Sequence, residues 1–242
     1  MSSRSSPMAS GPDRPASAHI VTVGAALPLL PIAGTAGYYG LPTSLKAQLL
    51  VQFAPQFLSY IGLSLWAARA SQVPIQLGLE KEKILTGLQW GIPTGLLLGG
   101  LNTFVILAVY PSLGFDITFL KQTPHGRLPV LVMVPWLICC IALFVEVNFR
   151  GFLLGRLADL ESQWRGTDSR ERPALLALAI SSFTFAFDPF LVNTFQHLHW
   201  IALWDGLIWG MLWMRTRNLW ITIVAHAVEV MVMYSMVRAA IG

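Results

Sequence analysis

The chain alternates long apolar runs with short polar links, and this pattern predicts its helices. Several runs reach the ~20 residues that a helix needs to cross a bilayer. We therefore expect an all-α fold, a polytopic membrane helical bundle of about seven transmembrane helices. The expected helices cover roughly residues 20–39, 45–68, 84–109, 128–160, 173–187, 200–214 and 219–237.

The composition supports a membrane protein. Hydrophobic residues make up 55% of the 242 residues and charged residues 12%, and the mean hydropathy is +0.60. A soluble domain carries about twice that share of charge. The net charge of +4 does not indicate nucleic acid, because basic residues in such a protein mostly set its topology. The expected surroundings are the lipid bilayer, with no nucleic-acid partner.

The chain divides into three expected parts. Residues 1–18 are rich in Ser and Pro, which predicts a disordered tail. Residues 19–127 hold the N-terminal transmembrane helices, and residues 128–242 form a carboxy-terminal core. The first apolar run is too long for the core of a typical signal peptide, so we expect a retained signal anchor. The small residues at 33–37 leave cleavage open.

Lysine and arginine residues predict the orientation in the membrane, because they concentrate in cytoplasmic segments. With seven spans and the amino terminus inside, eleven of them lie inside: Arg4, Arg14, Arg69, Lys81, Lys83, Arg156, Arg165, Arg170, Arg172, Arg215 and Arg217. Four lie outside: Lys46, Lys121, Arg127 and Arg238. We therefore expect a multi-pass protein of the bacterial inner (plasma) membrane with its N-terminus inside.

The third run carries glycines at positions 87, 91, 95, 99 and 100. Small residues four positions apart let two membrane helices approach closely. We expect this helix to pack tightly against a neighbour.

Two charged residues stand where hydrocarbon is the expected neighbour. Glu146 and Arg150 lie at the end of the fourth apolar run, and residues at i and i+4 share a helix face. Ionisable residues within a span are costly and count as candidates for a functional site. The alternative is a structural ion pair at a helix end, with Arg150 extending to the headgroups.

A histidine in the last helix falls at the depth of Glu146. Ten residues separate Glu146 from Arg156, and nine separate His226 from Arg217. At 1.5 Å per residue both lie ~14–15 Å below the inner surface. We therefore expect Glu146, Arg150 and His226 to converge in one cavity. A packing role for His226 is the alternative.

Other polar residues admit simpler interpretations. Glu229 shares the face of His226 and could be a neutral buried acid. Asp188 could cap a helix end, and Asp205 is expected at a wet interfacial position. His197 and His199 lie in a connector, and their role cannot be read from the sequence.

Two stretches of this chain resemble the CPBP family of CAAX proteases and bacteriocin-processing membrane proteins. The stretch Glu146-Val147-Asn148-Phe149-Arg150-Gly151 is similar to the first family motif, Glu-Glu-x-x-x-Arg. The stretch from Gly206 to His226 is similar to the family's carboxy-terminal run, with Arg215-Thr216-Arg217-Asn218 as its turn. The similarity covers about residues 128–240 and implies an intramembrane glutamic endopeptidase.

The chain departs from the family pattern at three positions. Val145 stands where the family has its first Glu, which activates water. Phe183 to Pro189 has the aromatic character of the second motif but no His, and Val230 replaces the Asn that stabilises the oxyanion. Without the first Glu, a general base must come from elsewhere.

The resemblance suggests roles for the remaining groups. Glu146 would be the base for water, with Arg150 orienting it. His226 would transfer a proton, and Asp188 or Glu229 would hold its tautomer. No cofactor and no metal are expected, and no oligomeric state is indicated. The substrate would be a membrane protein or a lipidated peptide. The alternatives are a non-catalytic membrane chaperone or immunity-type binding protein of the same fold, and a small transporter.

Overall fold

The computed structural model describes residues 26–166 and 174–242. The predicted tail, the start of the first predicted helix and part of the basic link at 162–172 lie outside these residues. Within them the chain forms helices and turns without a strand, which confirms the all-α prediction. The first half contains α2 (Leu29–Tyr39), α3 (Thr43–Lys46), α4 (Leu49–Ala67), α5 (Val73–Leu77), η1 (Lys81–Lys83), α6 (Ile84–Phe104), η2 (Val105–Val109), α7 (Tyr110–Ser112), η3 (Thr118–Gln122) and α8 (Pro124–Arg127).

The second half contains the helices around the candidate site. They are α9 (Val130–Val132), η4 (Met133–Leu137), α10 (Ile138–Glu146), η5 (Val147–Leu154), α11 (Gly155–Arg165), α12 (Leu175–Ala186), α13 (Pro189–Phe195), η6 (Gln196–Trp200), α14 (Ile201–Thr216) and α15 (Leu219–Ile241). The segments η2, η4 and η5 are π-helical. The prediction that the fourth helix continues past Arg150 is confirmed, because Val130–Arg165 forms one continuous helix.

The predicted number of seven spans is not confirmed. Among the described residues, four helices are long and apolar enough to cross a membrane, over Leu49–Ala67, Val73–Ser112, Val130–Arg165 and Leu219–Ile241. A fifth is added if Leu175–Ala186 and Pro189–Thr216 count together as one broken span. The helices α2 and α12 have 11 and 12 residues, or ~16–18 Å at 1.5 Å per residue. That is short of the ~30 Å hydrocarbon core.

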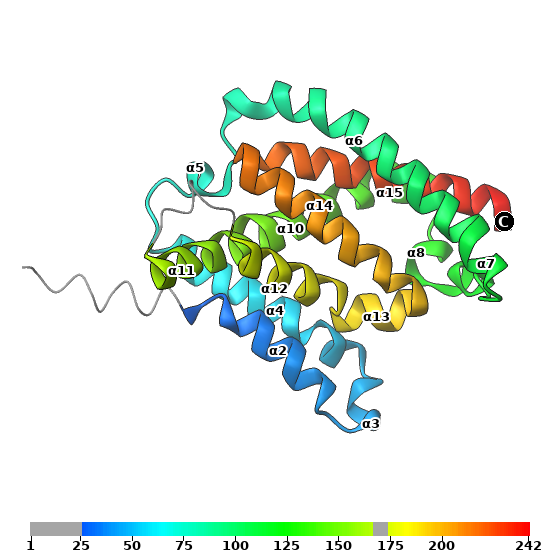
Figure 1. Ribbon diagram of the computed structural model, residues 1–242. Helices are drawn as coiled ribbons and strands as arrows, with labels where there is room; N and C mark the ends of the chain where they lie inside the picture. The colour runs from blue at the N-terminus through cyan, green and yellow to red at the C-terminus, as the bar shows by residue number, and fades with distance from the viewer. Residues whose placement is uncertain (1–25, 167–173) are drawn as a thin grey trace, which may run out of the picture.

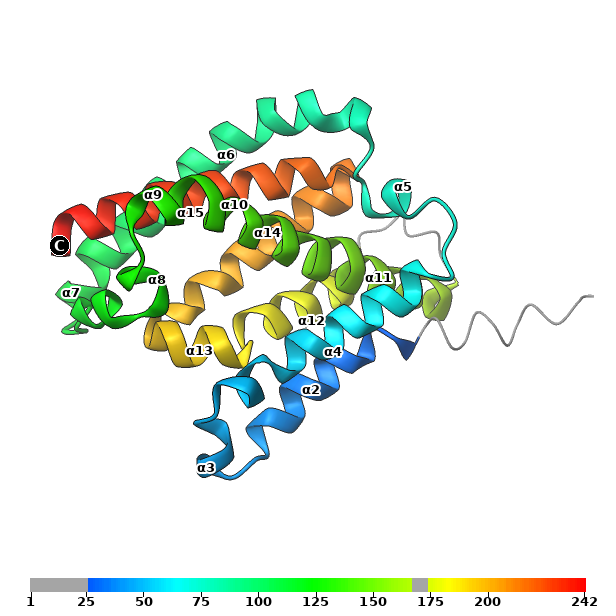
Figure 2. The same cartoon turned by 180° about the vertical axis from the view of Figure 1, so that it is seen from behind.

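Helix α15 lies between α6 and α10 (Figures 1 and 2). The predicted close packing of the glycine-bearing helix is confirmed, because α6 lays its glycines against α15. A Cβ at Gly91 would lie 2.6 Å from Cβ of Val224, and one at Gly95 would lie 2.5 Å from the carbonyl oxygen of Ala225. These contacts leave no room for a larger residue at either position, so the two helix backbones lie as close together as small residues allow.

Helix α14 packs against α12 by the same means. The position of a Cβ on Gly206 lies 3.1 Å from Cβ of Ser182, and that on Gly210 lies 2.4 Å from Leu178. The later glycine of α14 meets the earlier residue of α12, so the two helices run antiparallel. Helices α2 and α4 lie on the side of α12 that faces away from α14 in Figure 1.

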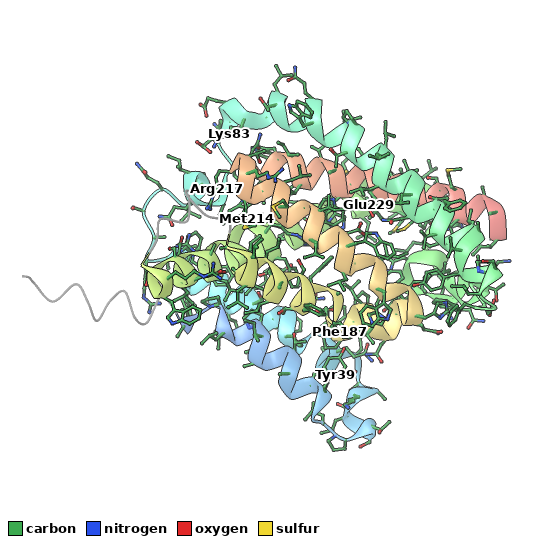
Figure 3. The ribbon with its side chains drawn as sticks, viewed as in Figure 1. Tyr39, Lys83, Phe187, Met214, Arg217 and Glu229 are labelled. Atoms are coloured by element: carbon green, nitrogen blue, oxygen red, sulfur yellow. The ribbon has the colours of Figure 1, made fainter. Side chains whose placement is uncertain are left out.

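Basic residues gather at one end of the bundle. Figure 3 shows Lys83 and Arg217 side by side at the end where α6 and α15 begin, and Lys83 Nζ donates to the carbonyl oxygen of Arg217 at 3.0 Å. At the opposite end, α7, α8, α13 and the carboxy terminus lie together (Figure 1). Farther along α2, the Tyr39 hydroxyl donates to the carbonyl oxygen of Phe187 at 2.9 Å (Figure 3).

Candidate functional site

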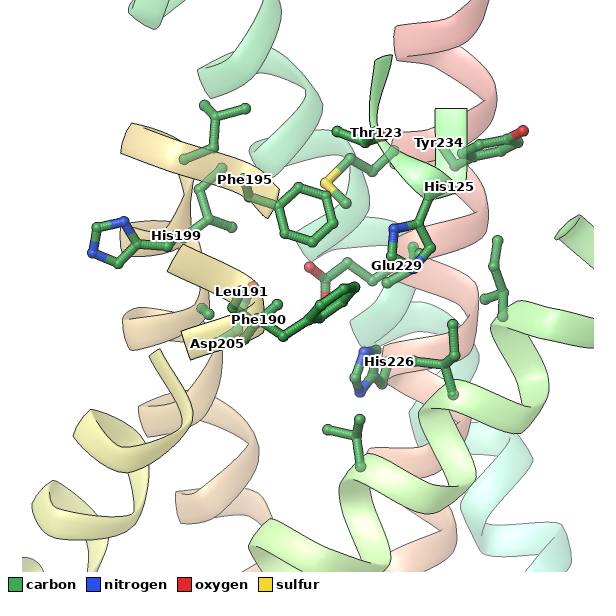
Figure 4. Close-up of a pocket in the computed structure, with 18 of the residues that line it drawn as sticks. Thr123, His125, Phe190, Leu191, Phe195, His199, Asp205, His226, Glu229 and Tyr234 are labelled. Atoms are coloured by element: carbon green, nitrogen blue, oxygen red, sulfur yellow. The ribbon is translucent and has the colours of Figure 1, made fainter. Parts of the chain in front are cut away.

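A cavity of about 1060 Å³ lies among α4, α10, α13, α14 and α15. Its walls are mostly apolar and aromatic, including Phe149, Phe190, Phe195 and Trp209. Six carboxyl and imidazole side chains also line it, and most are labelled in Figure 4: His125, Asp188, His199, Asp205, His226 and Glu229. A largely apolar cavity with a few polar groups is the usual form of a ligand or substrate site.

His226 projects from α15 into this cavity (Figure 4). Its ring Nδ1 lies 2.9 Å from Oε1 of Glu146, on α10. The ring also stacks on the indole of Trp209, with centroids 4.5 Å apart and 21° between the planes. These two contacts fix the position and the rotation of the imidazole, and they direct its Nε2 edge away from Glu146.

Glu146 and Arg150 lie behind His226. Their side chains are 0% and 2% exposed, and Arg150 Nη1 lies 3.3 Å from Glu146 Oε1. The guanidinium carbon of Arg150 lies 4.3 Å from the ring centroid of Phe185 and 5.1 Å from that of Trp209, which places the cation over aromatic faces. The alternative in which Arg150 extends to the headgroups is therefore wrong. The burial alone still allows a structural ion pair.

The backbone changes its winding at this point. The π-helical segment η5 begins directly after Glu146 and contains Arg150. Such segments often occur at functional sites, because an added residue per turn redirects side chains. Glu146 points to α15, while Asn148 accepts a hydrogen bond from Ser59 on α4. Side chains only two residues apart in this stretch thus contact two different helices, α15 and α4.

The structure brings Glu146, Arg150 and His226 together, but only His226 lines the cavity. Neither Glu146 nor Arg150 is among the described residues that form its wall. Val145, at the position of the family's first Glu, does line it. The position where the resemblance expects a base thus borders the cavity with an alkyl side chain.

A second polar cluster borders the same cavity. Asn102 on α6 donates through Nδ2 to Glu229 Oε1 at 2.5 Å and to Asp205 Oδ2 at 3.2 Å. Its own Oδ1 accepts from Trp204 Nε1 at 3.0 Å. Asp205 is only 4% exposed, so the expectation of a wet interfacial position for it is wrong. Burial follows because Asn102 supplies the hydrogen bonds that water would otherwise provide.

Asp188 caps a helix, as the sequence analysis allowed. Its Oδ1 accepts from the backbone nitrogens of Phe190 and Leu191, at 3.1 and 3.3 Å, and from Gln56 Nε2 at 3.0 Å. It therefore starts α13 rather than ending α12. Neither Asp188 nor Glu229 bonds to Nδ1 of His226 among the described contacts; Glu146 takes that place.

The two connector histidines have different surroundings. The His197 ring is surrounded by Tyr110, Phe115 and Phe119, with centroids 4.7 to 5.5 Å away. His199 lines the cavity, and its Nδ1 lies 2.5 Å from the carbonyl oxygen of Gln196. The described residues contain no group of three or more His, Cys, Asp or Glu able to hold a metal ion.

Sequence reasoning missed Asn102. Its signal was available, because an amide within an apolar helix needs a partner. The sequence could not name its partners, since α6 is far from α14 and α15 along the chain and its close approach to α15 depends on its glycines.

Comparison with known families agrees with the motifs. Residues 127–232 match the family described as Rce1-like, type II CAAX prenyl endopeptidase Rce1-like. The match contains Val145, Glu146, Arg150, Asp205 and His226, and confirms the resemblance drawn from the sequence. No curated protein and no solved structure matches the chain.

Proposed function

We propose that the protein is an intramembrane endopeptidase that hydrolyses a peptide bond inside this cavity. The Rce1-like match over residues 127–232 supports the class of reaction. The observation that carries the proposal is His226, which lines the cavity while the buried Glu146 holds its Nδ1. A base oriented by a third group is the usual arrangement for activating a nucleophile.

In this proposal His226, rather than Glu146, accepts the proton of water. The Glu146 carboxylate accepts a hydrogen bond from Nδ1–H, which leaves the lone pair of Nε2 facing the cavity. Nε2 then takes a proton from water, and the hydroxide attacks the carbonyl carbon of the substrate. Glu146 acts as a positioning residue, as the carboxylate of a Ser-His-Asp triad does.

Arg150 supports this arrangement from behind. Its guanidinium balances the charge of Glu146 and is itself fixed against Phe185. A carboxylate without such a partner would be costly in the apolar interior. The ion pair therefore keeps Glu146 available to hold His226.

The cavity favours a substrate with a large apolar part. Its aromatic and aliphatic walls suit a lipid chain or an apolar peptide segment, and the matched family is described as a prenyl endopeptidase. We propose a prenylated peptide, or a membrane protein segment, as the substrate.

One observation favours a second function, a binding protein without catalysis. Val145 lines the cavity where the family pattern has its first Glu, and an alkyl side chain cannot act as a base. In that case the cavity would hold a helix or a lipidated partner uncut.

The membrane proteome of a deletion strain separates the two functions. The strain is complemented with wild type, with His226→Gln or with Glu146→Gln, each at equal protein level. An endopeptidase predicts a substrate that is cut with wild type and accumulates uncut with His226→Gln. If all three strains have the same processed proteins, the peptidase proposal is wrong and the binding protein is favoured.

We further propose that the end carrying Lys83 and Arg217 faces the cytoplasm of a bacterial inner membrane. The grouping of basic residues at that end supports this orientation (Figure 3). Reporter domains fused after Gly166 and after Gly242 test it. The orientation predicts a cytoplasmic reporter at Gly166 and an external one at Gly242, and the reverse pattern would contradict it.

A further inference from the structure

Two carboxyl groups of the cavity wall meet at one amide. Asp205 comes from α14, Glu229 from α15, and Asn102 of α6 donates to both. Asn102 does not line the cavity among the described residues, whereas Asp205 and Glu229 do. The Asn102 amide thus binds Asp205 and Glu229 from the side away from the cavity.

Glu229 keeps one oxygen free of protein partners. Its side chain is 2% exposed, and Oε2 has no hydrogen-bond partner among the described residues. Figure 4 shows the Glu229 side chain extending from α15, past His125 and Phe190, toward the helix that carries Asp205. A buried polar atom without a partner is costly unless a ligand or a reacting group uses it.

The pair can hold a proton. Two ionised carboxylates around one amide, in surroundings of low polarity, would repel each other strongly. One proton shared by the pair removes that repulsion, as in other carboxyl dyads. A protonated Glu229 would then be a proton donor on the wall of the cavity.

Glu229 is well placed relative to His226. The two residues stand at i and i+3 on α15, which puts their Cβ atoms about 5–6 Å apart on one face. Both line the same cavity. A base and an acid at that spacing can flank the two atoms of a peptide bond, one beside the carbonyl carbon and the other beside the nitrogen.

We infer that Glu229, paired with Asp205, is the general acid that protonates the leaving nitrogen. This inference rests on the proposed peptidase function. His226 Nε2 takes a proton from water, and hydroxide adds to the carbonyl carbon. The C–N bond breaks as Glu229 gives its proton to nitrogen, which leaves an amine and a carboxylic acid. The proton on His226 returns to the carboxyl pair through water, so the cycle consumes one water.

Asp205 acts as a positioning residue in this scheme. Its negative charge favours the protonated form of Glu229, and Asn102 keeps the two carboxyl groups together. The glycine contacts between α6 and α15 determine the position of Asn102. The hydrogen bond from Trp204 to Oδ1 fixes the orientation of the amide, so that Nδ2 faces the two carboxyl groups.

Two probes separate the acid from the base. The first is a farnesylated, internally quenched peptide in phospholipid vesicles, and the second replaces its scissile amide with a thioester. A thiolate leaves without protonation, so the thioester needs the base but not the acid. Purified full-length protein is used as wild type, Glu229→Gln and His226→Gln.

The inference predicts a split between the probes. Glu229→Gln should slow amide hydrolysis by about 10²–10⁴-fold, the usual contribution of a general acid, and thioester hydrolysis by less than about tenfold. His226→Gln should slow both. Equal losses on both probes, or no loss, for Glu229→Gln would overturn the acid role. If wild type cuts neither probe, the proposed function fails and the acid role fails with it.

Infrared spectroscopy of the unliganded protein tests the proton itself. Near neutral pH the wild type should show the C=O stretching band of a protonated carboxylic acid. Glu229→Gln and Asp205→Asn should each lose it, while Glu161→Gln, which removes a buried carboxyl at the far end of the bundle, should keep it. A wild-type spectrum without the band would overturn the shared proton, whatever the activity.

Discussion

His226 and Glu146 meet across 80 positions of sequence, with Nδ1 and Oε1 2.9 Å apart. The carboxylate is fully buried, whereas the imidazole borders the cavity. In the proposed reaction the glutamate therefore acts only through the histidine. This relationship assigns different tasks to two residues that the motif resemblance treats as one site.

Removing Arg150 should destabilise the protein strongly. The change Arg150→Ala leaves the Glu146 carboxylate buried without its cation, and breaking a buried pair costs about 3–5 kcal/mol. Unfolding by SDS in mixed micelles measures the loss. Arg69→Ala is the control, because Arg69 is exposed and should change stability by less than about 1 kcal/mol. Equal effects of the two variants would show that the buried pair contributes little.

The glycines of α6 provide a matched test of helix packing. A Cβ at Gly95 would meet the carbonyl oxygen of Ala225 at 2.5 Å, whereas one at Gly100 meets nothing within 4 Å. Both Gly→Ala changes raise helix propensity by about 1 kcal/mol, so that gain cancels in the comparison. Gly95→Ala should push α6, and Asn102 with it, away from α15. It should therefore lower the midpoint of SDS unfolding and slow hydrolysis, while Gly100→Ala should do neither. A midpoint for Gly95→Ala at or above that of Gly100→Ala would contradict the close packing.

Restoring the family's first Glu should increase activity. Val145 lines the cavity, so Val145→Glu adds a carboxylate where the resemblance expects a base. Because a positioned base contributes about 10²–10⁴-fold, we expect hydrolysis of the farnesylated peptide to rise roughly tenfold or more. Val147→Glu makes the same change at a position outside the cavity wall, among the described residues, and should give no gain. A gain in both variants, or in neither, would count against the assignment of position 145.

His125 predicts a loss of stability in acid. It lies in α8, outside the spanning helices, and its ring stacks on Phe195 with centroids 5.6 Å apart. Burial lowers the pKa of His125 below its ordinary value of 6.5. The unfolded chain therefore takes up a proton as the pH falls below about 6.5, before the folded protein does. The stability is complete above that pH and declines as the pH falls toward the lowered value.

The measurement is the free energy of unfolding at about pH 7.5 and about pH 5.5, for wild type and for His125→Phe. The variant keeps an aromatic ring but cannot take a proton, so its loss in acid should be smaller. Identical losses in the two proteins would show that His125 does not contribute.

Much of the site was predictable because helix geometry is regular. The i, i+4 relation of Glu146 and Arg150 and the matched depth of His226 follow from a constant rise per residue. The close packing of α6 follows from its glycine spacing. Each of these depends only on residues within one helix and its membrane boundary.

The parts that could not be predicted depend on rotation and on contacts between helices. The π-helical winding after Glu146 and the stacking of His226 on Trp209 decide which side chain borders the cavity, and neither appears in a hydropathy pattern. Asp205 was expected in a wet position because its partner, Asn102, lies on another helix. The number of seven spans is not confirmed, because the prediction counted apolar runs as short as α12, which has 12 residues, as crossing the membrane.

In the proposed reaction His226 performs the proton transfer, and the rate at which purified protein in vesicles hydrolyses the farnesylated peptide tests this role. Wild type and His226→Gln are compared after SDS unfolding has shown similar stability. We expect wild type to cut the peptide and His226→Gln to be slower by about 10²–10⁴-fold. A His226→Gln rate within a few-fold of wild type would contradict it.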